Sequence, residues 1–160
     1  MTSQAASSLP GALMAAEIAE QPQVLARLLR DGAAPAQEIT AVLRGRAPRF
    51  VLFAARGTSD HAALYAKYLV EIKLGIPAGL ASPSTITAYG AMPNLRDVLL
   101  VSVSQSGGSP DLVETTQRAR DCGATTLAVT NAPSSDLAGA AEFHLDVMAG
   151  PERAVAATKS

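Results

Sequence analysis

Residues 98–111 have the sequence VLLVSVSQSGGSPD, in which a run of apolar residues leads into a loop of serines and glycines. The apolar run, Val98–Val103, lacks the alternation of polar and apolar residues that a half-exposed strand shows, so we expect both of its faces to be buried. Strands of this kind are typical of a parallel sheet that helices cover on both sides. The stretch therefore predicts an α/β fold.

The same strand pattern recurs along the chain, separated by helical patterns. Further strands are predicted at 50–55, 76–81, 125–129 and 143–147. Helices are predicted at 59–74, 83–91 and 110–122, with a short helix or turn at 134–141. Regular alternation of strand and helix favours a doubly wound domain with a five-stranded, mainly parallel sheet, for which we assume the flavodoxin-like strand order 2-1-3-4-5.

The N-terminal part of the chain has a different pattern. Residues 1–11 are small and polar, which predicts a flexible arm, and 12–47 contain apolar residues at helical spacing, which predicts N-terminal helices. Pro22 is either a kink in the first helix or the first-turn proline of a second one. The α/β domain is then expected to occupy residues 48–160.

Composition excludes several classes of function. The 160 residues carry 13 basic and 14 acidic side chains, so there is no positive field for nucleic acid or an anionic membrane surface. A single cysteine excludes a disulfide framework, and the first residues lack the pattern of a signal peptide. We therefore expect a cytoplasmic protein that binds a small molecule and needs neither a metal nor a cofactor.

Two loops rich in hydroxyl groups and glycine follow the first and third predicted strands. In the assumed strand order these two loops meet at the topological switch point, where ligands of such sheets bind. Glycine lets backbone N–H groups approach a phosphate, and serine and threonine hydroxyls donate to its oxygens. Helix capping by Ser59 and Ser109 is the simpler alternative. The candidate phosphate-binding residues are Gly57, Thr58, Ser59, Ser104, Gln105, Ser106, Gly107 and Ser109.

Five segments resemble motifs of the SIS (sugar isomerase) domain family, in the same order along the chain. They are residues 14–22, 56–59, 102–111, 130–131 and 152–159. The resemblance is to the first SIS domain of the isomerase part of glucosamine-6-phosphate synthases (glutamine–fructose-6-phosphate aminotransferases) and of their deaminase-like relatives. Such domains bind sugar phosphates and usually occur as tandem pairs. The resemblance thus implies a phosphosugar-binding domain of a hexosamine-phosphate isomerase or deaminase.

The resemblance also implies roles for individual residues. The side chains of Ser59 and of residues 104–106 and 109 would hold the phosphate, and the backbone of Val155 would contact the sugar. In the family, the base, the ring-opening histidine and a lysine come from later in the chain. We therefore expect this chain alone to bind substrate without turnover. We also expect it to form a homodimer. Residues 1–2 are Met-Thr rather than Met-Cys, which argues against release of ammonia from glutamine, and Ala157 stands where a serine is usual.

Three other functions remain open: a phosphosugar-sensing regulatory module without catalysis, an aldose–ketose isomerase with a single SIS domain, and the isomerase part of a glutamine–fructose-6-phosphate transaminase. The sequence offers no carboxylate–histidine set for the second. The remaining polar residues are assigned no role in the site. We expect Glu17 and Glu20 to be surface charges, Lys159 to be frayed, His61 to be solvated and Cys122 to be a packing residue.

Overall fold

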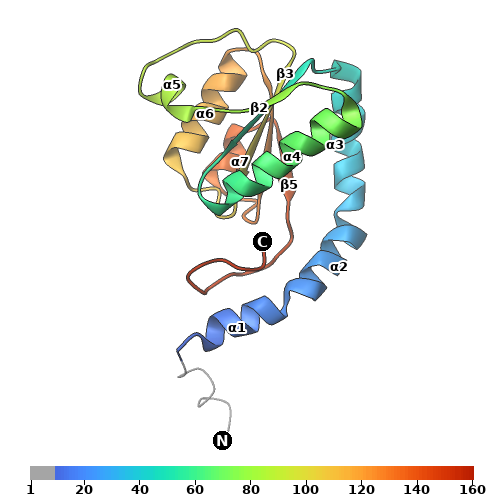
Figure 1. The fold of residues 1–160 in the computed structure, drawn as a ribbon, viewed down its shortest axis with the longest axis vertical. Helices are drawn as coiled ribbons and strands as arrows, with labels where there is room; N and C mark the ends of the chain where they lie inside the picture. Colours follow the sequence, from blue (N-terminus) through green and yellow to red (C-terminus); the bar gives the residue numbers. More distant parts are fainter. Residues whose placement is uncertain (1–9) are drawn as a thin grey trace, which may run out of the picture.

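The computed structural model describes residues 10–160, so most of the predicted N-terminal arm lies outside the described part of the chain. Helices and strands alternate as expected from residue 50 onward (Figure 1). The helices are α1 (Ala12–Ala19), α2 (Gln21–Asp31), α3 (Ala33–Arg46), α4 (Thr58–Leu74), α5 (Pro83–Thr87), α6 (Pro110–Asp121) and α7 (Asp136–Ala140). The strands are β1 (Phe50–Ala55), β2 (Ala78–Leu80), β3 (Val98–Ser104), β4 (Thr125–Thr130) and β5 (Phe143–Asp146).

The five strands form one sheet in the order β2-β1-β3-β4-β5, which confirms the assumed strand order. Every neighbouring pair is parallel. Ala55 is opposite Val103, and Ser104 is opposite Thr130. This register brings the carboxyl ends of β1, β3 and β4 to the same edge of the sheet, where the predicted loops begin.

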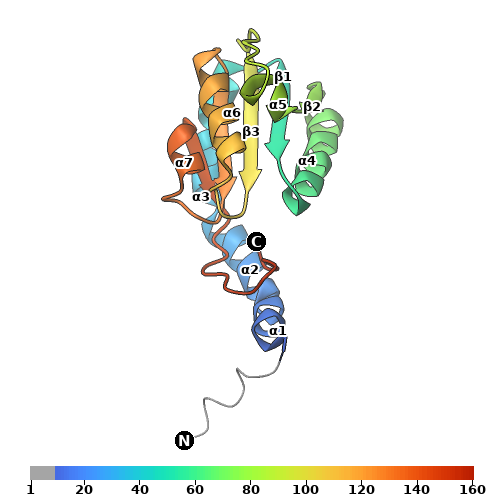
Figure 2. The ribbon, with the colours of Figure 1, turned by 90° about the vertical axis from the view of Figure 1, so that its left-hand side faces the viewer.

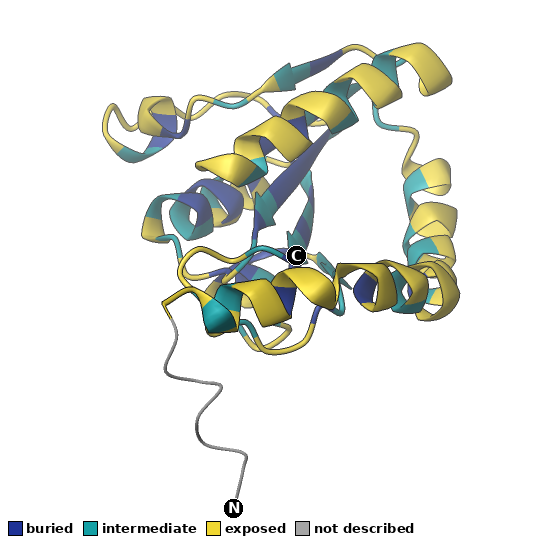
Figure 3. Cartoon of the chain, turned by 60° about the horizontal axis from the view of Figure 1, so that its bottom comes forward, coloured by how far each residue is buried: buried dark blue, intermediate teal, exposed yellow. Residues whose placement is uncertain are grey.

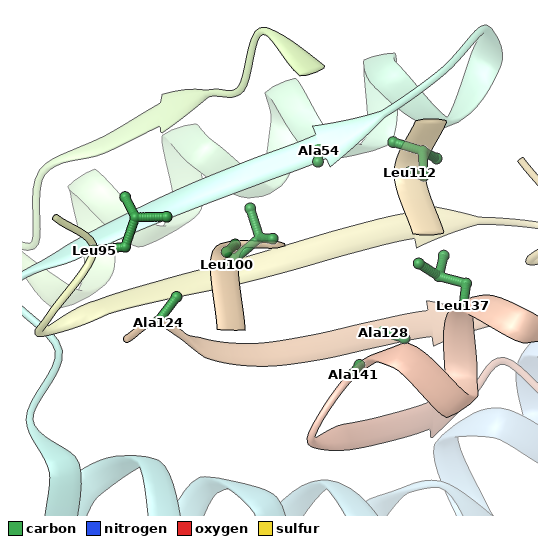
Figure 4. Packing of buried hydrophobic residues seen from close by; sticks show 9 residues of the cluster. Ala54, Leu95, Leu100, Leu112, Ala124, Ala128, Leu137 and Ala141 are labelled. Atoms are coloured by element: carbon green, nitrogen blue, oxygen red, sulfur yellow. The ribbon is translucent and has the colours of Figure 1, made fainter. Parts of the chain in front are cut away.

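Helices cover both faces of the sheet (Figure 2). On one face, α6 and α7 pack against β3 and β4 through Leu100, Leu112 and Leu137, each fully buried (Figure 4). On the other face, α4 packs on β1 and β2 through Ala63, and Phe53 belongs to the same cluster. Burying the apolar surface of such strands on both sides is the main force that stabilises the domain.

The N-terminal helices extend beyond the sheet and are largely exposed to solvent (Figure 3). Pro22 lies in the first turn of α2, which confirms the second of the two alternatives for this residue. In Figure 1, α1 and α2 run beside residues 150–160, which we call the C-terminal segment and which forms neither helix nor strand. Among the described residues 10–160, no helix is both long enough and apolar enough to cross a membrane.

Candidate functional site

A cavity of about 440 Å³ opens at the carboxyl edge of the sheet. It lies where the ends of β3 and β4 meet the first turn of α4, and the C-terminal segment forms its remaining wall. The polar groups of its lining are hydroxyls and amides, and the other lining side chains are alanines and valines. The lining residues are Thr58, Ser59, Ala62, Val103, Ser104, Gln105, Val129, Thr130, Asn131, Val147, Ala156, Ala157 and Ser160.

The structure brings four of the predicted site residues together in this cavity, namely Thr58, Ser59, Ser104 and Gln105. Ser106 lines an adjacent cavity of about 540 Å³, which shares Gln105 and Asn131 with the first. Gly57 and Gly107 have positive φ angles of 60° and 64° and shape the turns at the ends of β1 and β3. Ser109 is the N-cap residue of α6, and Val155 is 93% exposed; neither lines the two cavities.

The hydroxyls of the loop after β3 are oriented by backbone amides. The Ser104 oxygen accepts a hydrogen bond of 3.2 Å from the Gly107 N–H, and the Ser106 oxygen accepts one of 3.3 Å from the Gly108 N–H. A hydroxyl that accepts from a backbone amide still has its own proton to donate. Both serine hydroxyls therefore keep a proton for a further acceptor.

Gly107 allows this loop to pack against α7. A Cβ atom at this position would lie 2.1 Å from the Ser135 hydroxyl oxygen, and the φ angle of 64° disfavours any other residue. The same Ser135 oxygen accepts a hydrogen bond from Ala138 N and caps α7, while Leu137 N donates to Gly107 O at 3.1 Å. Glycine at this position thus lets the serine loop pack directly against α7.

An ion pair joins the loop after β1 to the start of α6. Arg56 Nε donates to Asp111 Oδ2 at 2.6 Å. Asp111 lies in the first turn of α6, where its negative charge also faces the positive end of the helix dipole. Both side chains are partly exposed, so the pair contributes about 0–1 kcal/mol. It fixes the relative position of the two loops more than it stabilises the fold.

Glu152 connects the strand ends to the C-terminal segment. Its Oε2 atom accepts hydrogen bonds from Gln105 Nε2 at 3.0 Å and Asn131 Nδ2 at 3.4 Å. Its Oε1 atom accepts from the backbone N–H groups of Thr158 and Lys159, both at 3.0 Å. One carboxylate therefore holds both the Gln105 side chain and the backbone of residues 158–159 in place beside the cavity.

The protonation of Glu152 follows from these contacts. Burial acts to raise the pKa of Glu152, but hydrogen bonds from Ser160, Lys159, Gln105 and Thr158 outweigh it and hold the pKa below its ordinary value. A lowered pKa means that the carboxylate stabilises the folded arrangement above its unfolded pKa and that this stabilisation is lost as the pH falls through the lowered value. At neutral pH the contacts of Glu152 are fully formed.

Two expectations about charged residues are wrong. Glu17 is buried, and its carboxylate accepts hydrogen bonds from the backbone of the C-terminal segment. Lys159 is buried rather than frayed, and its Nζ atom lies 2.6 Å from Glu20 Oε2. Glu20 is about half exposed, as expected of a surface charge, although it has this ion-pair partner. The partners lie 136 to 139 residues apart, so no local pattern reveals them.

Neither histidine lines the two cavities. His61 is exposed on α4, as expected of a solvated side chain. His144 on β5 lies beneath the end of β4, with Nε2 2.9 Å from the Thr130 hydroxyl. Burial lowers the pKa of His144, although Asp146 acts in the opposite direction, so this imidazole is neutral at pH 7.

Comparison with protein families identifies the domain that carries this site. The family model described as the SIS domain matches residues 47–160. The chain belongs to the SIS domain family. The match includes all five strands, both serine-rich loops and the C-terminal segment.

The relatives extend this family assignment. The chain is 40% identical over 158 residues to a glutamine–fructose-6-phosphate aminotransferase (isomerizing) of Symbiobacterium thermophilum, covering 92% of this chain and 25% of that protein. A candidate phosphosugar isomerase from Silicibacter pomeroyi DSS-3 is 45% identical with a TM-score of 0.88, over 92% of this chain and 45% of that one.

A third relative is the C-terminal domain of the glucosamine-fructose-6-phosphate aminotransferase of Francisella tularensis, which is 28% identical with a TM-score of 0.75. The match covers 92% of this chain and 42% of that one. The SIS domain described here is therefore homologous to the isomerase part of these aminotransferases. It spans a quarter of the first curated relative and less than half of the two solved structures.

Replacement of Gly107 by alanine should destabilise the domain. The new methyl group would meet Ser135 at 2.1 Å and would force a positive φ on alanine, so we expect the free energy of unfolding in urea to fall by about 2–4 kcal/mol. Gly45→Ala is the matched control: Gly45 lies inside α3 with open space around it, and alanine should raise helix stability by up to about 1 kcal/mol. Equal stability of the two variants would contradict this account of the loop.

Proposed function

We propose that this SIS domain binds a hexose or hexosamine 6-phosphate in the cavity at the carboxyl edge of its sheet. The observation that carries the proposal is that Ser59 and Ser104, which are 45 residues apart in the sequence, line one cavity at the predicted switch point. The relatives support it, since one is named an aminotransferase of fructose 6-phosphate and another a candidate phosphosugar isomerase.

The phosphate would be held by neutral donors. Among the described residues, those that line the cavity include no lysine or arginine. Hydroxyl groups and backbone N–H groups would therefore stabilise the negative charge of the phosphate. Helices α4 and α6 both begin at this edge, directly after the two loops, and the positive ends of their dipoles favour an anion there. Ser106 and Ser109 lie in the second loop; Ser106 lines the adjacent cavity, and Ser109 is the N-cap residue of α6.

We infer that the protein to which this domain belongs acts on glucosamine 6-phosphate or fructose 6-phosphate, by aldose–ketose isomerisation. Deamination and amino transfer are the variants of that chemistry that the relatives and the sequence motifs leave open. Val155, which the family resemblance places at the sugar, lies in the C-terminal segment next to two residues of the cavity wall, Ala156 and Ala157. A cytoplasmic location stays a prediction.

We further propose that the domain by itself binds substrate without converting it. Moving a proton between sugar carbons needs a base within hydrogen-bond reach of that proton. Among the described residues, the side chains that line the cavity with Ser59 and Ser104 are hydroxyls, amides and small apolar groups, and none is a carboxylate or an imidazole. Asp146 and Glu152 line the adjacent cavity, where Glu152 is already bonded to Gln105. Asp60 and Asp111 lie in first helical turns nearby, and Asp111 is already paired with Arg56.

Association with a second copy of the chain also stays a prediction. Helix α4 supports it, because its outer face exposes Tyr65, Tyr68 and Ile72, which are 67%, 55% and 71% accessible. Contiguous apolar side chains of this kind mark interaction surfaces, and a two-fold dimer would pair the face with itself. Light scattering would show a species of twice the chain mass.

The binding proposal predicts a strong dependence on the phosphate group. Calorimetry should show binding of glucosamine 6-phosphate and far weaker binding of glucosamine. Ser104→Ala and Ser106→Ala should each lose a charge-assisted hydrogen bond worth about 1.5–3 kcal/mol, which raises Kd roughly 10- to 150-fold. Ser134→Ala, at an exposed serine outside both cavities, is the control. Equal affinity for the sugar with and without its phosphate would refute the proposal.

The absence of turnover is tested with the same preparation. The isolated chain, incubated with glucosamine 6-phosphate or with fructose 6-phosphate and ammonia, should give neither ketose–aldose conversion nor ammonia release above background in a coupled assay, because its cavity lacks a base. Turnover that disappears on replacement of Asp60, Asp111 or His61 would show instead that the catalytic groups lie on this chain.

A further inference from the structure

Helix α1 presents a buried carboxylate to the backbone of the C-terminal segment. Glu17 is 4% exposed, and its Oε1 atom accepts hydrogen bonds from Arg153 N at 2.6 Å and Ala154 N at 3.3 Å. An ionised carboxylate is costly to bury unless charge-assisted hydrogen bonds compensate it. Glu17 is therefore committed to these two backbone amides.

The same stretch of α1 and α2 holds the far end of the segment. Glu20 pairs with the Lys159 ammonium at 2.6 Å, and the Gln21 side-chain amide donates to the Thr158 carbonyl oxygen. Arg27, nearly two turns further along α2, donates to Met148 O at 2.8 Å and fixes the chain just before the segment. The side chains of residues 17, 20 and 21, within the stretch that resembles the family pattern, thus all form hydrogen bonds to residues 153–159.

The anchored residues bracket the part of the segment that faces the cavity. Glu17 holds residues 153–154, while Glu152 and Gln21 hold residues 158–159. Between these two anchors lie Ala156 and Ala157, which line the cavity opposite the serine loops. Helix α1 itself contributes no residue to the lining, so it acts on the cavity only through the segment that it holds.

We propose that Glu17 is a positioning residue that sets the wall of the site facing the sugar, while the serine loops bind the phosphate independently of it. The proposal rests on the proposed function, because it assigns the serine loops to the phosphate group of the ligand and the C-terminal segment to its sugar. It gives the N-terminal helices a role in recognition: they hold the backbone on either side of the two alanines that line the cavity.

The test compares two ligands on two variants by NMR titration of the 16.4 kDa chain. Glu17→Gln keeps the shape of the side chain and removes its charge, so it weakens the hold on residues 153–154. We expect the Kd for glucosamine 6-phosphate to rise roughly tenfold or more, with the Kd for inorganic phosphate unchanged. Glu38→Gln, at an exposed glutamate of α3, is the matched control and should change neither Kd.

Glu20→Gln provides a second variant that is independent of any folding defect in the first, because Glu20 is about half exposed. It should weaken sugar-phosphate binding by a smaller factor and again leave phosphate binding unchanged. Wild-type affinity of both variants for glucosamine 6-phosphate would overturn the inference and leave the proposed function intact. Equal loss for both ligands would overturn it too, since Glu17 would then support the whole fold, and a wild-type chain that binds neither ligand would refute both proposals.

Discussion

The parallel pairing of β1 with β3 is the constraint on which the site depends. Because both strands are buried on both faces, their register is fixed by packing against α4 on one side and α6 on the other. Parallel strands that point the same way release their loops at the same edge, so Ser59 and Ser104 approach each other although far apart in sequence. The cavity between these loops is thus a direct consequence of strand order, and glycine at position 107 lets the second loop turn tightly against α7.

Two side-chain carboxylates hold the C-terminal segment in place as a wall of the cavity at the edge of the sheet. The C-terminal segment forms no helix or strand of its own, so its backbone N–H groups need other partners. Glu152 accepts from residues 158 and 159, and Glu17 accepts from residues 153 and 154. Two acidic residues, one from the N-terminal helices and one from the segment itself, therefore fix an irregular stretch as one wall of a cavity.

Local sequence patterns predicted the parts of the structure that depend on local chemistry. Apolar runs predicted all five strands, and the assumed order agrees with the general rules for such sheets. Burial of both faces holds for β1 and β3, whereas β5 at the edge has no fully buried residue. Strand β2 is shorter than its apolar run because Pro77 has no N–H to donate and Pro83 begins the next helix. The roles of Glu17, Glu20 and Lys159 were missed because their partners lie at the other end of the chain, and a charge on a helix predicts solvent unless that partner is known.

The account is tested most directly by the crystal structure of the chain with bound glucosamine 6-phosphate. It predicts a phosphate whose oxygens lie within hydrogen-bond distance of the Ser59, Ser104 and Ser106 hydroxyls, with the sugar directed toward residues 155–157 of the C-terminal segment. A phosphate bound elsewhere on the chain, with the Ser104 and Ser106 hydroxyls still bonded only to the amides of Gly107 and Gly108, would contradict it.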